Sequence, residues 1–245
     1  MRLTTLGTSH GDPTYCRFNS SNLVESGGYS YLIDVGEPVA ALLVRAKKDF
    51  NALKAVFITH MDDDHVDGIT SLIKMLIKHS QAGNCTKIFM PEEIAIPPLE
   101  AWLKVLRIVW PSPVVLLKTV KPGLVYRDGV IEVEAVPTEH LRHPEHPVSF
   151  AYIVRSEGKT VVFTGDLRAD FSDFPVCACD LCVCEATHYA PETAVPILKS
   201  APIKRLIVSH IGNEWHGAGE ADLRRWLAGL PYPAEIAHDG RAFEI

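Results

Sequence analysis

Apolar and polar positions along the chain form a pattern that predicts an α/β protein. Short runs rich in β-branched and aromatic residues predict strands, which alternate with longer segments of helical periodicity. In the first half, strands are predicted near residues 2–7, 22–26, 29–34, 54–58, 86–90, 114–118 and 129–136. In the second half, they are predicted near residues 148–155, 160–164, 180–184, 204–209 and 234–237.

Four helices are predicted between these strands, near residues 38–48, 66–79, 191–199 and 219–228. In the second helix, apolar residues recur three and four positions apart, which places them on one face against a sheet. These residues are Ile69, Leu72, Ile73 and Leu76. The segment from Pro91 to Pro113 holds five prolines, and we expect a short helix and loops there, near the rim of the functional site.

The composition is that of a globular protein. The chain has 245 residues, of which 47% are hydrophobic, and we interpret residues 1–245 as a single domain. The sequence has no uncharged apolar stretch of the ~18 residues that a transmembrane helix needs. Its first residues lack the apolar region of a signal peptide. We therefore expect a cytoplasmic protein with no membrane partner.

The net charge of −6 bears on the choice of partner. It argues against extended nucleic acid, because proteins that bind it cluster Lys and Arg on one surface. It still allows a small anionic substrate, since bound divalent cations would dominate the local field. The sequence leaves a homodimer open.

Four of the six cysteines fall within eight residues, at Cys177, Cys179, Cys182 and Cys184. Their spacing is compatible with a structural zinc site. Alternatively, Cys182 and Cys184 belong to a buried strand, in which cysteine acts as a small hydrophobic residue. We favour the buried strand, and we expect no disulfides in a cytoplasmic protein.

The segment from His60 to Gly68 carries four potential metal ligands directly after a predicted strand. His60, Asp62, Asp64 and His65 lie within six residues of one another. Zinc and similar divalent metals bind imidazole and carboxylate groups at about 2 Å. A solvated, Asp-rich turn is the plainer alternative for this segment taken alone.

Three more residues of ligand type follow predicted strands elsewhere. His140 follows the strand that ends near residue 136, Asp166 follows 160–164, and His210 follows 204–209. The same arrangement thus occurs four times in one chain, which favours a metal site over four unrelated surface turns.

These residues resemble the five motifs of the metallo-β-lactamase fold superfamily, in order and spacing from residue 3 to about residue 215. The matching residues are Asp34 for the first motif, His60, Asp62, Asp64 and His65 for the second, and His140, Asp166 and His210 for the third to fifth. The resemblance implies an αββα sandwich of two mixed sheets flanked by helices. The chain departs from the family at Asp62, where histidine is usual.

The resemblance also implies two divalent metal ions, zinc or manganese, with iron as a further option. The implied ligands are His60, Asp62 and His140 for one metal, Asp64, His65 and His210 for the other, and Asp166 as the bridge between them. A hydroxide shared by the metals would attack the substrate, so Asp64 and Asp166 also count as catalytic residues. Asp34 would hold the ligand turn through hydrogen bonds.

Asp62 leaves three interpretations open. As a ligand, its carboxylate is a harder donor than imidazole and favours manganese or iron over zinc. It is otherwise a supporting residue outside the coordination shell, or a loop residue beside a metal that has fewer protein ligands.

Two segments resemble the phosphodiesterase branch that includes ribonuclease Z. They are the turn Leu6–Pro13, with Asn19-Ser20-Ser21 after it, and the element Cys184-Glu185-Ala186-Thr187-His188. In that branch a histidine near the second element supports protonation of the leaving group, and His188 is the nearest candidate here. Because His188 is offset from the family pattern, a structural role is the alternative.

Ribonuclease Z carries a long basic arm for transfer RNA between its third and fourth motifs. Here only 25 residues, 141–165, separate His140 from Asp166, which leaves no room for such an arm. We therefore predict a binuclear metal-dependent phosphodiesterase acting on a small phosphodiester or a cyclic nucleotide. A hydrolase of carboxylic esters, lactones or thioesters is the alternative. An RNA-processing nuclease and a non-catalytic binding protein are less favoured.

Two further histidines are candidates for substrate contacts. His10 lies in the turn after the first strand, and His216 lies six residues beyond His210.

Overall fold

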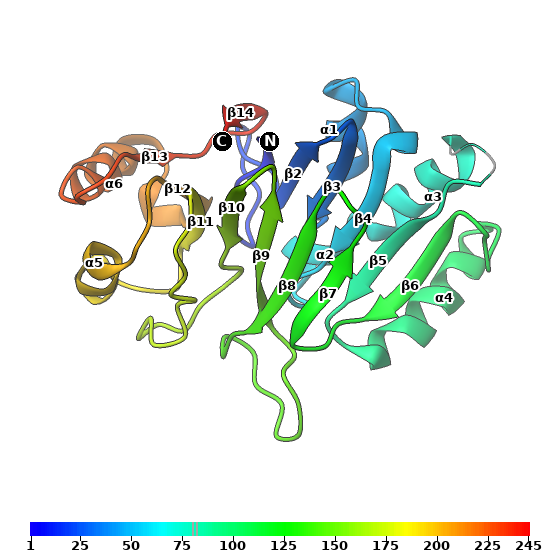
Figure 1. Ribbon diagram of the computed structural model, residues 1–245. Helices are drawn as coiled ribbons and strands as arrows, with labels where there is room; N and C mark the ends of the chain where they lie inside the picture. Colours follow the sequence, from blue (N-terminus) through cyan, green and yellow to red (C-terminus); the bar gives the residue numbers. More distant parts are fainter. Residues whose placement is uncertain (80, 82) are drawn as a thin grey trace.

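A computed structural model of the chain describes residues 1–79, 81 and 83–245. Two seven-stranded sheets lie face to face, and helices cover their outer faces (Figure 1). The two chain termini lie side by side, because the last strand pairs with the first. The αββα sandwich expected from the resemblance is confirmed.

The first sheet has the strand order β14-β1-β2-β3-β4-β5-β6. Its strands are β1 (Arg2–Gly7), β2 (Ser21–Ser26), β3 (Tyr29–Ile33), β4 (Leu53–Phe57), β5 (Thr86–Met90), β6 (Val115–Thr119) and β14 (Arg241–Glu244). The β3 to β6 neighbours pair in parallel, whereas β14, β1, β2 and β3 pair antiparallel.

The second sheet has the strand order β13-β12-β11-β10-β9-β8-β7. Its strands are β7 (Gly123–Arg127), β8 (Glu132–Pro137), β9 (Phe150–Ser156), β10 (Lys159–Phe163), β11 (Leu181–Ala186), β12 (Leu206–Ile211) and β13 (Ala234–Ile236). The β10 to β13 neighbours are parallel, so the carboxyl ends of these strands share one edge of the sheet.

The helices are α1 (Val39–Arg45), α2 (Asp63–Val66), α3 (Ile69–His79), α4 (Ile96–Val105), α5 (Pro191–Ser200) and α6 (Glu220–Leu227). Short 3₁₀ turns are η1 (Phe50–Ala52), η2 (Glu93–Ala95), η3 (Asn213–Trp215) and η4 (Gly217–Gly219). Helices α1, α3 and α4 contribute to one apolar layer on the first sheet, and α5 and α6 to another on the second. Among the described residues, none of the helices has the length and apolar character needed to cross a membrane.

The core between the sheets is largely aromatic. Phe57 of β4 stacks on Phe89 of β5 with ring centroids 5.1 Å apart, and Tyr126 of β7 meets both rings edge-on. Tyr152 of β9 packs against Phe57 from the second sheet. Burying each such side chain stabilises the fold by about 1.5–3 kcal/mol. This rigid packing supports the strand ends that carry the candidate ligands.

The helix predicted over 66–79 is wrong at its start. The chain forms α2 and then α3, with a break at Asp67–Gly68. A Cβ atom on Gly68 would lie 2.4 Å from the Val35 carbonyl oxygen, so only glycine permits this close approach. The Gly68 amide donates to the same oxygen at 2.9 Å, and His65 just before the break is buried.

Strands β7 and β14 were not predicted from the sequence. β7 is an edge strand that follows Pro122 and alternates exposed and less exposed positions, so its apolar signal is weak. β14 has only four residues and exists because it pairs with β1 at the other end of the chain. The Pro91–Pro113 segment does form a helix, α4, which contributes Leu103 to the layer on the first sheet.

The cysteine-rich segment agrees with the buried-strand interpretation. Cys182 and Cys184 lie in β11, and with Cys179 they pack into the apolar layer beneath α5 and α6. All six cysteines are free thiols. Among residues 1–79, 81 and 83–245, no cluster of potential metal ligands includes a cysteine.

Candidate metal centre and catalytic site

Four strand ends bring the predicted ligands to one place between the sheets. His60 follows β4, Asp166 follows β10, and His210 lies within β12 near its end. His140 lies at the base of the loop between β8 and β9. Residues separated by up to 150 positions thus become neighbours, because parallel strands end at a common edge.

The first group consists of His60, His140 and Asp166. The His60 Nε2 atom lies 3.6 Å from Asp166 Oδ2, and His140 Nε2 lies 3.9 Å from the same oxygen. Asp62 Oδ2 lies 3.5 Å from each of the two imidazole Nε2 atoms, and its side chain is 46% exposed. The structure therefore places Asp62 beside this group, on its solvent side.

The second group consists of Asp64, His65 and His210. Asp64 Oδ2 lies 3.0 Å from His210 Nε2 and 3.4 Å from His65 Nε2. Asp166 Oδ1 is 3.4 Å from His65 Nε2, and Asp166 Oδ2 is 3.4 Å from His210 Nε2. The carboxylate of Asp166 therefore lies between the two groups and faces both.

The donor atoms of these groups fit divalent metal ions. Ligands of one tetrahedral metal at about 2 Å lie about 3.3 Å from one another, close to the separations seen here. His60 Nε2, His65 Nε2 and Asp166 Oδ1 are buried and have no hydrogen-bond partner. Buried polar atoms without partners are costly, so these atoms are explained if each binds a metal.

The charges around Asp166 also suit cations. Burial acts to raise the pKa of Asp166, but the neighbouring His210, His65 and His60 imidazoles hold it well below its ordinary value. Burial likewise opposes ionisation of Asp64, and His210 and His65 reverse that effect and lower its pKa. His140 and His60 lower the pKa of Asp62. The carboxylates are therefore ionised at neutral pH.

Asp34 and Thr59 hold the two histidines of the β4 turn. Asp34 is buried, adopts a left-handed φ of 62°, and accepts hydrogen bonds from the Thr59 amide at 2.7 Å and the Thr59 hydroxyl at 3.0 Å. His65 Nδ1 lies 2.9 Å from Asp34 Oδ2, and His60 Nδ1 lies 3.0 Å from the Thr59 hydroxyl. With Nδ1 engaged in this way, both Nε2 atoms are left for a metal. This hydrogen-bonding role of Thr59, which directly precedes His60, was not predicted.

His188 lies in the wall of the site beside Glu185. Its Nδ1 atom is 2.9 Å from Glu185 Oε2 and 3.6 Å from Asp166 Oδ2. Burial acts to lower the pKa of His188, but Glu185 and Asp166 raise it to about 9. The structure therefore brings His188 to the site in spite of its offset in the sequence.

Glu185 was not predicted as a site residue. It is buried with Asp166, His188 and His210 around it. Its two oxygens accept backbone hydrogen bonds from Leu167 at 2.7 Å and from Thr187 and His188 at 3.0 Å each. Because these bonds occupy its oxygens, Glu185 is an anchor for the turns that carry Asp166 and His188. A carboxylate inside the apolar strand β11 was the available signal in the sequence.

A cavity of about 490 Å³ lies over the two groups. Its described lining is His10, Gly11, Met61, Asp62, Asp63, Asp64, Asp166, Thr187, His188 and His210. This volume is that of a site for a small ligand, which is typically about 300–1,000 Å³. His10 belongs to this wall.

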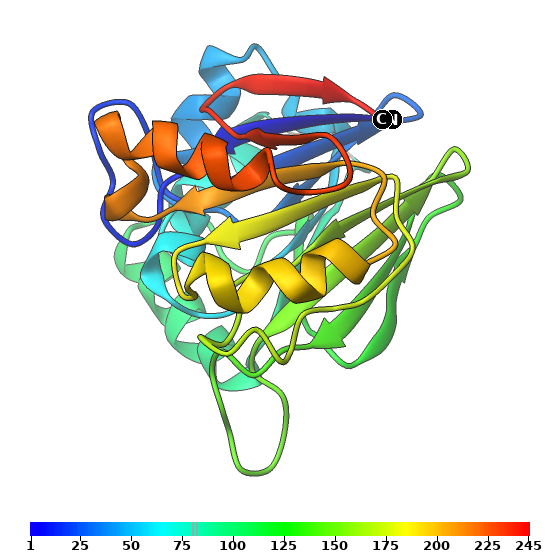
Figure 2. The same ribbon diagram turned by 90° about the vertical axis from the view of Figure 1, so that its left-hand side faces the viewer.

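His216 is not part of the described lining of that cavity. Its Nε2 atom bonds to the Ile211 carbonyl oxygen at 2.9 Å, and its ring centroid lies 6.1 Å from that of His10. The loop of residues 8–20, blue in Figure 2, lies beside the segment that carries His216, orange in the same view. His216 thus stands behind His10 rather than at the cavity itself.

Residues 1–180 match the protein family described as Anti-Pycsar protein Apyc1. The chain belongs to this family.

Relatives of this family member with curated names are ribonucleases Z. The enzyme of Haloferax volcanii is 27% identical over an alignment that covers 100% of this chain and 95% of the relative. That of Brevibacillus brevis is 31% identical over 66% of this chain and 50% of its own length. The chain thus spans nearly all of the first relative and half of the second.

Several solved structures share the fold over the whole length of this chain. The metallo-β-lactamase fold protein YhfI of Bacillus subtilis has a TM-score of 0.77 at 20% identity, covering 100% of this chain and 99% of its own. A diphosphatase of the PhnP family has a TM-score of 0.71 at 20% identity, covering 100% and 97%. Zinc-bound PqqB of Methylobacterium extorquens has a TM-score of 0.70 at 15% identity, covering 100% of each chain.

The resemblance identified from the sequence is therefore confirmed. The family member is a metal-dependent hydrolase of the metallo-β-lactamase fold, in the ribonuclease Z-like branch.

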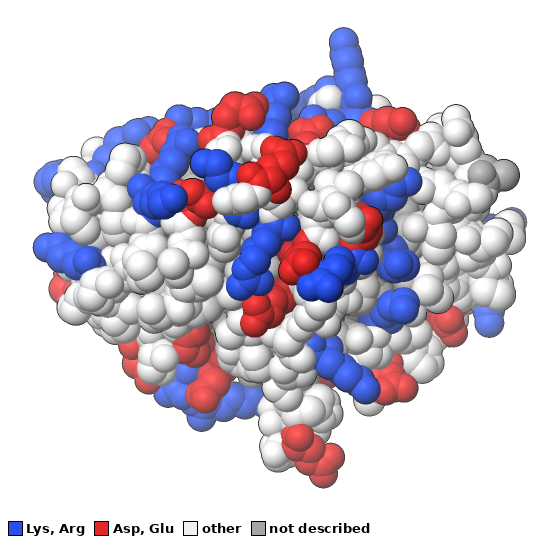
Figure 3. All heavy atoms as spheres, in the orientation of Figure 1, with Lys and Arg blue, Asp and Glu red and all other residues white. Residues whose placement is uncertain are grey.

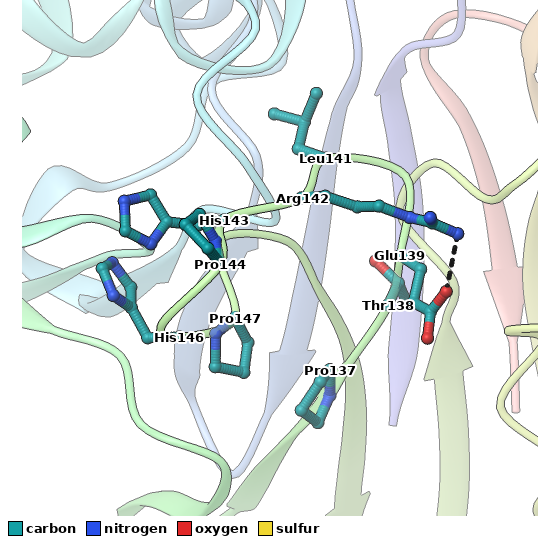
Figure 4. Close-up of a pocket in the computed structure, with 9 residues that line it drawn as sticks. All are labelled: Pro137, Thr138, Glu139, Leu141, Arg142, His143, Pro144, His146 and Pro147. Carbon is teal, nitrogen blue, oxygen red and sulfur yellow. Dashed lines mark hydrogen bonds and ion pairs between the residues drawn. The ribbon is translucent and has the colours of Figure 1, made fainter.

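The loop between β8 and β9 protrudes from the protein on the side of the site (Figures 1 and 2). It borders one cavity of about 630 Å³, in which Arg142 bonds to Glu139 opposite the His143 and His146 rings (Figure 4). A second cavity, of about 670 Å³, lies between this loop and the Pro91–Ile94 end of the proline-rich segment. The Pro91–Ile94 end of that segment lines this second cavity, whose described lining includes no residue of α4.

Proposed function

We propose that the protein is a binuclear metal-dependent phosphodiesterase that acts on a small phosphodiester, such as a cyclic nucleotide. The observation that carries this proposal is the cavity of about 490 Å³ above two ligand groups, with the Asp166 carboxylate facing both. A diphosphatase of the PhnP family shares the fold, which supports hydrolysis at phosphorus.

The two groups would each hold one divalent cation, zinc or manganese, with iron as a further option. The proposed ligands are His60, Asp62 and His140 for the first, Asp64, His65 and His210 for the second, and Asp166 for both. When bound, such cations lower the pKa of a water molecule and offset the negative charge that develops on a phosphate. The remaining steps depend on side chains of the chain itself.

The charge of the cavity wall makes the cations a condition for substrate binding. Asp62, Asp63, Asp64 and Asp166 all contribute to the lining, and the lining contains no lysine or arginine among the described residues. An anionic phosphodiester would be repelled by these carboxylates alone. Two cations would offset four negative charges and make room for the anion.

His188 is the proposed general acid for the leaving group. Glu185 engages its Nδ1 atom, so Nε2 on the other side of the ring is the atom that can reach a substrate in the cavity. A general acid needs hydrogen-bond contact with the leaving oxygen. His10, which also lines the cavity, is proposed to contact the substrate.

An RNA substrate is the second candidate, because the curated relatives are named ribonuclease Z. Three observations favour the small substrate. The segment between His140 and Asp166 has 25 residues, the net charge is −6, and basic and acidic side chains are intermingled on the face in Figure 3. Hydrolysis of an ester or lactone on the same fold is the third candidate.

A substrate panel separates these candidates. The purified protein, loaded with manganese or zinc, is assayed on cyclic nucleotides, bis-p-nitrophenyl phosphate, a precursor transfer RNA, p-nitrophenyl acetate and a homoserine lactone. We expect turnover of the small phosphodiesters and its loss in Asp166→Asn, while Asp170→Asn, an exposed aspartate on the same turn, retains it. Preferred cleavage of the transfer RNA or of the carboxylic esters would contradict the proposal, as would full activity of Asp166→Asn.

A further inference from the structure

A buried polar network fastens the loop of residues 8–20 to the chain near its C-terminal end. Arg17 stands at its centre and is 2% exposed. Its Nη1 atom donates to the Thr8 hydroxyl at 2.7 Å and to the Ala237 carbonyl oxygen at 2.6 Å. A buried guanidinium is costly unless its donors are paired, so these contacts define one arrangement of the loop.

Thr8 links Arg17 to a carboxylate. The Thr8 hydroxyl accepts from Arg17 and donates to Asp239 Oδ1 at 2.6 Å. The other oxygen of Asp239 accepts from the Phe18 amide at 2.7 Å. Arg17 Nη2 also lies 3.5 Å from Glu220 Oε2 at the start of α6. The network therefore joins three segments that are far apart in the sequence.

The network reaches the metal site through the backbone of Thr8. The Thr8 carbonyl oxygen accepts from the Ile211 amide at 2.9 Å, and Ser9 forms a parallel bridge with Ile211. Ile211 directly follows His210, whose φ of 51° is left-handed. A residue with a side chain keeps that conformation only where its surroundings impose it.

We propose that Arg17 is a positioning residue for the second metal position. It acts through Thr8 and Ile211 to hold His210 in its left-handed conformation, with the imidazole directed at Asp64. The inference rests on the two-metal site of the proposed function. The first metal position depends on His60 and His140, which lie on the β4 turn and the β8–β9 loop, so it should respond much less.

Variants of Thr8 and Arg17 test this role. Thr8→Val keeps the shape and removes the hydroxyl, Thr8→Ser keeps the hydroxyl, and Arg17→Lys keeps the charge but loses the planar fork. Thr86→Val is the matched control, because Thr86 is as buried as Thr8 and its hydroxyl bonds only to the Leu53 carbonyl oxygen of β4, at the strand's other end. Each protein is titrated with zinc and with manganese against a chelator.

We expect Thr8→Val and Arg17→Lys to lower the affinity for one of the two metals by about 10- to 100-fold. This is the usual effect of losing a residue that orients a ligand. The affinity for the other metal should stay close to that of the parent protein. Thr8→Ser and Thr86→Val should leave both metal affinities close to the parent values. In the metal-free protein, the Ile211 amide should exchange its hydrogen faster in Thr8→Val than in Thr86→Val.

Equal metal affinities and equal Ile211 exchange in Thr8→Val and Thr86→Val would overturn the inference. Both readouts are independent of catalysis. A protein that binds two metals but cleaves no phosphodiester would contradict the proposed function. The comparison of Thr8→Val and Arg17→Lys with Thr86→Val would still decide the part played by Arg17.

Discussion

At the scale of single residues, the site is distinguished by Asp62. Its carboxylate lies 3.5 Å from the Nε2 atoms of His60 and His140. The superfamily motif that the sequence resembles usually has a histidine at this position. A carboxylate is a harder donor than imidazole, so Asp62 as a ligand would shift the relative affinity toward manganese. The half-exposed position of Asp62 leaves room for the larger imidazole ring.

Asp62→His should therefore raise zinc-supported activity relative to manganese-supported activity. We expect a change of about tenfold, the lower end of the range for changes around a metal ligand. The measurement is the ratio of turnover rates with the two metals, parent against variant. Asp67→His, at an exposed position outside the described cavity lining, serves as control. An unchanged ratio in Asp62→His would remove Asp62 from the ligand set.

His188 gives a second prediction at this scale. Its imidazole is engaged by Glu185 on one side and lines the cavity on the other. His188→Ala should slow a cyclic nucleotide, whose leaving group is an alkoxide, by about 10²–10⁴-fold, the usual contribution of a general acid. Bis-p-nitrophenyl phosphate should be slowed far less, because p-nitrophenolate leaves without a proton. Equal slowing of both substrates would assign His188 a structural role.

At the scale of elements, the turn between β7 and β8 connects the two sheets through one carboxylate. Asp128 accepts hydrogen bonds from the Tyr126 hydroxyl of β7 at 2.9 Å and from the Tyr31 hydroxyl of β3 at 2.7 Å. Its other oxygen accepts from the amides of Val130 and Ile131. Partial burial acts to raise the pKa of Asp128, but the Ile131 amide and the Tyr31 hydroxyl lower it below its ordinary value.

Asp128→Ala should reduce the free energy of unfolding at pH 7 by about 1–2 kcal/mol, since the carboxylate is partly exposed. A carboxyl group whose pKa is lowered by folding stabilises the protein above its ordinary pKa, which is about 3.9. That contribution is lost as the pH falls through the lower, folded-state pKa. The difference between parent and variant, measured by urea unfolding, should therefore shrink below about pH 4; a difference independent of pH would contradict this account.

At the scale of the whole molecule, the candidate metal centre lies where both sheets end. The β4 turn belongs to the first sheet, and Asp166 and His210 belong to the second. Metal ions bound there would connect the two sheets and relieve the burial of ionised carboxylates. Ligands that bind only the folded state stabilise it according to their concentration relative to the dissociation constant.

Removing metal with a chelator should therefore lower the melting temperature. At a free metal concentration of about 100 times the dissociation constant, the loss is about 2.7 kcal/mol. For a chain of this length, that corresponds to about 5–10 °C. Calorimetry with and without chelator, with zinc or manganese added back, measures the shift. A melting temperature that does not respond to chelator or to added metal would contradict a metal centre between the sheets.

The sequence by itself determined the alternation of strands and helices, the fold class and the approximate position of the ligand residues. These features are local, because hydrophobic periodicity and short motifs are read within a few residues of one another. The break in the helix at Gly68 was beyond such a reading, since it depends on the Val35 carbonyl oxygen from another segment. The edge strands β7 and β14 were missed for a related reason, because each forms only by pairing with another strand, β8 for β7 and β1 for β14.

Within the candidate site, the sequence supplied the residue types and only the tertiary structure supplied their neighbours. Glu185 and Thr59 carry no motif of their own, and their roles follow from hydrogen bonds to backbone and imidazole atoms. His10 and His216 look alike in the sequence, yet one lines the cavity and the other bonds to the Ile211 carbonyl oxygen. The placement of a side chain across 100 or more residues depends on how strands pair and end, which no short stretch of sequence records.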